Sequence, residues 1–168
     1  MVEILNMKEQ LIKILDTPLG RKIVISADFS MSVEFNNEVL MAIKLVEEEM
    51  KCQGIDISKL KDTNFIISEN GEVSIKTADV GNYIYFSIIN YSEIKKYNQN
   101  ARLAILIEEL VHNYWNLNNE EKIKYIDIAI LKRFDPQVKL EDIFDMSTIP
   151  EDKKRNNLLL TPKCFDEY

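Results

Sequence analysis

The chain has 168 residues, of which 46% are hydrophobic and 29% are charged, and its net charge at pH 7 is −7. This length and composition are typical of one soluble globular domain with its own core. The acidic excess argues against a nucleic-acid binder that neutralises phosphates, and it suits a surface that engages a basic protein partner. No run approaches the roughly 18 uninterrupted apolar residues that a membrane helix needs.

The compartment is inferred from the start of the chain and from its cysteines. The first 15 residues carry charges throughout and lack the apolar core of a signal peptide. Cys52 and Cys164 lie far apart in sequence and do not have metal-type spacing. We therefore expect a cytoplasmic protein with two reduced thiols. The abundance of Ile, Lys and Asn is typical of an AT-rich bacterial or phage gene.

The first part of the chain predicts one helix and two short strands. Residues 2–16 space their apolar side chains in a broadly helical pattern, which ends at the turn residues that follow. Residues 21–26 have the composition of a strand. Residues 29–35 alternate apolar and polar side chains, so we expect a second strand with one buried face.

The middle of the chain predicts a helix followed by three strands. The helix covers residues 37–52, and Asn36 or Asn37 can cap it. The strands are expected at residues 64–68, 72–78 and 83–90. Asn70-Gly71, between the first two of these strands, predicts a β-hairpin because this dipeptide favours a tight two-residue turn.

A helical period begins near residue 98 and dominates the rest of the domain. We expect helices over residues 98–116 and 120–134 and one more helical turn at 140–144. Residues 1–146 are therefore predicted to form a single α+β domain in which a small mixed sheet packs against helices. Residues 147–168 are predicted to form a tail.

The helix over residues 98–116 gathers the side chains with the most chemistry on one face. At 100° per residue, Glu108, Glu109 and His112 share a polar side opposite a broad apolar side. Glu108 lies four residues before His112, the only histidine, and Glu109 lies three before it, so these side chains can converge. The spacing suits a shared metal ion or proton, and it equally suits a solvated face with a loose ion pair.

The next helix carries a carboxylate within its apolar stripe. Asp127 lies among isoleucines there, and burying a carboxylate costs several kcal/mol unless a partner pairs with it. Asp127 can bind a backbone amide or Lys124, or it can point at the His112 helix as a metal ligand or as the partner of one. Glu120, seven residues earlier on the same face, is a further candidate ligand.

This order of elements resembles that of the small zincin metallopeptidases, such as the SprT-like and ImmA-like groups. The passage from SIIN (87–90) to LAILIEELVHNYW (103–115) is similar to that family's step from edge strand to active-site helix. The resemblance covers roughly residues 37–134 and implies a zincin-like fold. In such a fold an HExxH helix holds zinc with two histidines, its glutamate takes a proton from bound water, and a following helix supplies a third ligand.

The resemblance also assigns roles to particular residues. Glu109 takes the place of the general base and His112 that of the second zinc-binding histidine, while Glu108 stands where the first histidine is found. A site of carboxylates and one imidazole differs in charge and softness, and it would favour divalent metals other than zinc or bind zinc weakly.

The third ligand depends on how the following helix is aligned with the family. If Ile126-Asp127 corresponds to the family's Ala-Asp pair, the ligand position falls on Ile123, which cannot bind a metal. A different register offers Glu120 or Glu121. The sequence leaves these alternatives open.

Three functional hypotheses follow from these residues, one of which is a purely structural module in which this group of residues is incidental. The first is a zincin-like protein with a degenerate site and no cofactor, which binds another protein as a small acidic inhibitor or regulator, encoded by a phage or mobile element and acting against host defence. Strand addition at residues 83–90 would provide its binding surface. The alternative is a metal-dependent peptidase or other hydrolase that holds Zn, Mn or Fe through Glu108, His112 and Glu120 or Asp127, with Glu109 as the base.

Overall fold

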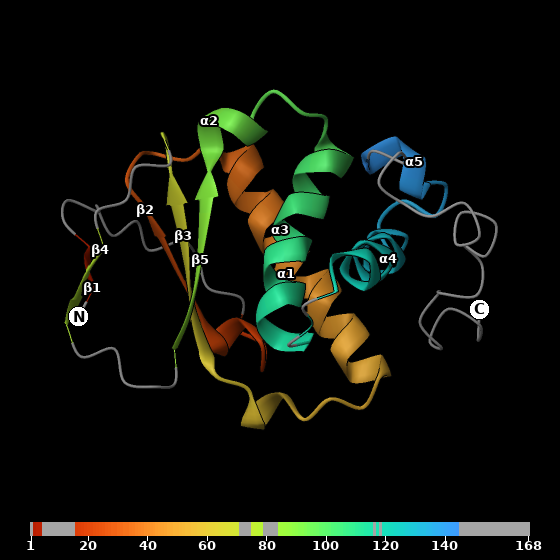
Figure 1. Ribbon diagram of the computed structural model, residues 1–168, viewed down its shortest axis with the longest axis horizontal. Helices are drawn as coiled ribbons and strands as arrows, with labels where there is room; N and C mark the ends of the chain where they lie inside the picture. Colours follow the sequence, from red (N-terminus) through yellow and green to blue (C-terminus); the bar gives the residue numbers. More distant parts are fainter. Residues whose placement is uncertain are drawn as a thin grey trace.

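The computed structural model describes residues 2–4, 16–70, 75–78, 84–115, 117 and 119–144. Its described part has the predicted α+β class. A sheet of β2 (Ile23–Ala27), β3 (Asp62–Ser68) and β5 (Ile84–Asn90) is covered on one side by helices, and a small ladder lies on its other side (Figure 1). Within this part of the chain, no helix is both long enough and apolar enough to cross a membrane.

The sheet is parallel throughout its described strands, which run in the order β2-β3-β5. The predicted sheet was mixed, but antiparallel pairing is confined to a separate ladder between β1 (Val2–Ile4) and β4 (Ile75–Ala78). The predicted hairpin between residues 64–68 and 72–78 is therefore wrong. Because β3 is buried along most of its length, it takes the centre of the sheet and pairs with β2 and β5 instead of with β4.

Three long helices carry most of the remaining residues. They are α1 (Val33–Cys52), α3 (Gln99–Trp115) and α4 (Glu120–Leu131). The short elements are the 3₁₀ turns Gly20–Lys22 and Ile57–Lys59 and the helical turns α2 (Tyr91–Ile94) and α5 (Leu140–Ile143). The helices at residues 98–116 and 120–134 and the turn at 140–144 are thus confirmed, with the α4 helix ending three residues early.

The start of α1 corrects the prediction of a strand at residues 29–35. The helix begins at Val33, and the Ser32 side chain caps it by accepting a hydrogen bond from the Phe35 backbone N–H at 3.1 Å. Met31 and Phe35 are buried whereas Val33 is 75% exposed. A spacing of four residues between buried side chains fits both a strand and a helix, and the serine cap decides between them.

Two other predictions differ from the structure, and they concern the start of the chain and the cysteines. Val2–Ile4 is a strand and not part of a helix, and residues 5–15 of the same predicted segment lie outside the described residues. Cys52 is disulfide-bonded, so the expected pair of reduced thiols is wrong. The tail at residues 147–168 also lies outside the described residues.

The core fills the space between the sheet and the helices α1 and α3. Its largest fully buried side chains include Phe65 from β3, Met50 from α1 and Leu106 from α3. Two hydrogen bonds fix α3 on the sheet: Thr63 Oγ1 lies 2.6 Å from the Tyr114 hydroxyl, and the Asn113 amide donates to Ser87 Oγ at 2.7 Å. The rotation of α3 about its axis is therefore fixed relative to the sheet.

Candidate metal centre

The local sequence explains why α3 presents its acidic residues on one side. The Asn98 side chain accepts a hydrogen bond from the Ala101 backbone N–H at 2.9 Å, which satisfies a donor at the start of the helix. The apolar side of the helix is buried as predicted and consists of Leu103, Leu106, Ile107, Leu110, Val111 and Tyr114. Glu108 and His112 consequently lie on the side that meets α4, whereas Glu109 lies toward β5 and α2.

The helix α4 begins with its own cap and brings a second set of carboxylates to α3. The Asn119 side chain accepts hydrogen bonds from the backbone N–H groups of Glu121 and Lys122. A buried ion pair holds the other end of α4 in place, because Arg133 Nη2 lies 2.9 Å from Glu49 Oε2 on α1. The cap sets where α4 begins, and its packing on α3 together with this ion pair positions Glu120.

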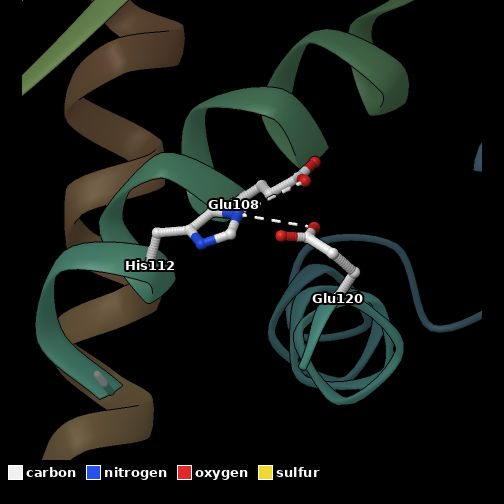
Figure 2. Close-up of side chains that lie close together, drawn as sticks. All are labelled: Glu108, His112 and Glu120. Carbon is white, nitrogen blue, oxygen red and sulfur yellow. Dashed lines mark ion pairs between the residues drawn. The ribbon is translucent and has the colours of Figure 1, made fainter. Parts of the chain in front are cut away.

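Three of the four predicted metal ligands meet between α3 and α4. His112 Nε2 lies 3.7 Å from Glu108 Oε1 and 3.7 Å from Glu120 Oε2, and one ligand atom from each residue lies within 4.8 Å of the others. Figure 2 shows these three side chains pointing toward one another across the two helices. Glu108 and His112 are partly buried, whereas the Glu120 side chain is 63% exposed. We call these residues the Glu–His–Glu cluster.

The geometry of this cluster fits a small divalent cation. Ligand atoms at about 2.0–2.2 Å from a tetrahedral ion lie roughly 3.4 Å from one another; the two separations from His112 Nε2 are 3.7 Å, and the third is within 4.8 Å. Two carboxylates and one imidazole form an oxygen-rich donor set that suits Mn²⁺, Fe²⁺ or Zn²⁺. Glu121, the alternative third ligand, is not part of the cluster.

The surroundings of Glu108 and Glu109 on α3 favour neutralisation of their negative charges. Burial raises the pKa of the Glu108 carboxyl above its ordinary value; nearby His112 opposes this shift, and Glu120 adds to it. Burial likewise raises the pKa of Glu109. Each carboxylate would gain from a cation placed between the two helices.

Asp127 occupies a different position from the one expected of a direct ligand. It is fully buried, and neither carboxylate oxygen has a hydrogen-bond partner within the part of the chain that the structure describes. Burial raises its pKa well above the ordinary value, and Glu108, Glu109 and Glu120 contribute further. It therefore lies near the Glu–His–Glu cluster in electrostatic terms but outside it in geometry.

A cavity of about 330 Å³ reaches Glu109 from the side of the sheet. It lies between the end of β5, α2 and the first half of α3, and its apolar wall includes Ile88, Ile94 and Ile105. This cavity was not predicted from the sequence, although Ile105 gives a signal because it is an apolar residue on the polar face of the helix. Glu109 thus lies beside both the cluster and a space large enough for a small organic group.

Searches of protein-family models, of curated proteins and of solved structures find no match to this chain. The resemblance to zincins therefore stays a prediction from the sequence.

Proposed function

We propose that this protein binds a divalent metal ion between α3 and α4 and uses it in a hydrolytic reaction. The proposal rests on the convergence of Glu108, His112 and Glu120, whose ligand atoms lie within 4.8 Å of one another. The sequence alone favoured a degenerate site without metal. The proximity of Glu120 to His112 supports the alternative, because it supplies a third ligand from a second helix.

The residues of the site would have different roles in the reaction. A bound divalent ion lowers the pKa of a coordinated water and so supplies a nucleophile near neutral pH. Glu109 is the candidate for the general base, since it adjoins the cluster, and burial raises its pKa toward the range useful for proton transfer. The cavity beside Glu109 would receive the part of the substrate next to the scissile bond.

The metal content of the protein tests this proposal. Protein purified without a chelator or a histidine tag, from medium supplemented with zinc, manganese and iron, should contain close to one metal ion per chain. The His112→Ala variant should lose the metal. Glu141→Gln, which changes an exposed residue on α5, is the control and should retain it. Wild-type protein without metal would remove the hydrolytic function from consideration.

A second candidate function is the binding of another protein at β5. Among the described strands, β5 pairs only with β3, so its other edge has no strand partner there. Ile88 on this strand is 42% exposed and lines the cavity that reaches Glu109. An inhibitor or regulator could use this edge to add a strand from its target.

The two candidate functions respond differently to the same variants. Ile88→Lys should abolish the capture of a protein partner if β5 is the binding surface. Glu109→Ala should leave that capture intact while it abolishes hydrolysis. A partner whose binding depends on Glu109 and on bound metal would instead behave as a substrate.

A further inference from the structure

The acidic character of the contact between α3 and α4 extends beyond the Glu–His–Glu cluster. Asp127 lies two helical turns after Glu120 on the same side of α4, and its exposed fraction is 0%. Both of its carboxylate oxygens are buried and lack a hydrogen-bond partner among the described residues. Buried carboxylates are ordinarily paired with a cation or with several N–H donors, so the ionised form of Asp127 has no partner that balances its charge.

The charged groups near Asp127 increase this imbalance. The negative charges of Glu108 and Glu109 on α3 and of Glu120 on its own helix each raise the pKa of Asp127 further. The basic residue closest to it in sequence, Lys124, places its Nζ 5.6 Å from the centre of the Phe144 ring, near α5. Four carboxylates thus act on one another, and the charges of His112 and, at Glu108, of Lys124 oppose this repulsion.

We propose that Asp127 sets the cation affinity of this site, because a divalent ion in the Glu–His–Glu cluster balances its buried charge. The inference rests on the proposed metal-binding function and adds a fourth acidic residue to it. Asp127 is outside the three ligands that converge, so it acts as a positioning residue, through space or through a metal-bound water. Such an interaction is strengthened by the full burial of Asp127, whereas the cluster itself is partly open to solvent.

Two measurements on Asp127→Asn test this role, since the substitution removes the charge and retains the shape. Mn²⁺ affinity, measured by electron paramagnetic resonance titration at pH 7, should fall by about 10–100-fold, as for other residues that support metal ligands. The melting temperature of the metal-free protein should rise by about 2–4 °C, because an uncompensated buried charge is removed. A purely structural aspartate would show a lower melting temperature and an unchanged affinity.

Two further variants make the result decisive. Glu141→Gln changes the net charge by the same amount on the exposed side of α5 and should alter neither quantity. Asp127→Leu leaves no polar group that needs a hydrogen-bond partner. Like Asp127→Asn, it should lower the Mn²⁺ affinity and raise the melting temperature of the metal-free protein. If wild-type protein binds Mn²⁺ and Asp127→Asn binds it equally well, the inference is overturned while the metal-binding function stands. If wild-type protein does not bind Mn²⁺, the inference also fails, and the metal content decides the proposed function separately.

Discussion

Glu108 and Glu109 are neighbours in the chain, but the helix directs them toward different surroundings. Glu108 lies in the Glu–His–Glu cluster with His112, whereas Glu109 lines the cavity that begins at the end of β5. Both carboxyls have a raised pKa because of burial, yet only one has an imidazole nitrogen within 4 Å in the structure. Glu108 is therefore suited to hold a cation, and Glu109 is suited to exchange a proton.

This division predicts opposite results from two conservative substitutions. Glu109→Gln should retain the bound metal and lower hydrolysis by about 10²–10⁴-fold, the usual contribution of a general base. Glu108→Gln should lose metal affinity. Metal analysis and a fluorogenic peptide library would measure the two effects. Loss of metal in Glu109→Gln would show that the roles are assigned incorrectly.

The buried carboxylates also predict an unusual dependence of stability on pH. The pKa values of Glu108, Glu109 and Asp127 are raised in the folded protein, so the folded state binds their protons more tightly than the unfolded state does. Their contribution to the free energy of unfolding is lowest when they are charged, and it recovers as the pH falls through the raised pKa values.

Urea unfolding in the presence of a chelator, over a series of pH values between 8 and 5, would measure this dependence. We expect the metal-free protein to become more stable toward pH 5. Asp127→Asn should show a shallower slope, and Glu141→Gln should follow the wild type. A wild-type protein whose stability falls steadily on acidification would contradict the assignment of these three groups.

At the scale of the elements, the position of the site depends on where helices begin and on how they are joined. Ser32 starts α1, and Glu49 on that helix pairs with Arg133 beyond the end of α4. Glu49 also accepts a hydrogen bond from Gln53, which in turn accepts one from the Trp115 indole at the end of α3. This chain of contacts links the three long helices and fixes the distance between the two halves of the cluster.

The cap of α1 can be tested against the residue that sequence reasoning chose for it. Ser32→Ala should lower the free energy of unfolding by about 1 kcal/mol, because a donor at the helix start loses its acceptor. Asn37→Ala, at a position inside the helix, should change it by less than about 0.5 kcal/mol. Chemical denaturation measures both, and the reverse order of effects would indicate that the helix begins later.

The ion pair between α1 and the end of α4 should contribute strongly because it is buried. Arg133→Met leaves the Glu49 side chain, which is 0% exposed, without its cation. We expect the free energy of unfolding to fall by about 3–5 kcal/mol. Lys59→Met, which breaks an exposed pair with Asp56, should produce no measurable change. Equal effects of the two substitutions would show that the buried pair does not fix α4.

At the scale of the whole molecule, the site lies between α3 and α4, two helices from the second half of the chain. They pack together on the elements of the first half. The sheet and α1 bury the apolar side of α3, and α4 then brings its carboxylates to the remaining polar side (Figure 1). A cation between α3 and α4 would bind the folded protein and not the unfolded chain, so it should stabilise the entire fold.

Thermal unfolding with added metal measures this coupling. At a free Mn²⁺ concentration of 100 times the dissociation constant, the free energy of unfolding should rise by about 2.7 kcal/mol. The chelator should reverse the gain, and His112→Ala should show none. A rise of equal size in His112→Ala would place the cation elsewhere on this acidic surface.

Much of the fold could be predicted from local pattern. The helical period of α3 and α4, the β-rich runs of β2, β3 and β5, and the polar side that carries Glu108 and His112 all follow from side-chain spacing along one element. The start of α1 could not be predicted in this way, because apolar residues at 31 and 35 fit either period.

The sequence by itself determined which side chains share a helix face, since that depends only on 3.6 residues per turn. The tertiary structure alone decided that β3 pairs with β5 and not with β4, and that Glu120 reaches His112 while Asp127 is buried outside the cluster. The physical reason is that strand pairing and the packing of α4 on α3 depend on contacts between residues far apart in sequence, on which local periodicity has no influence.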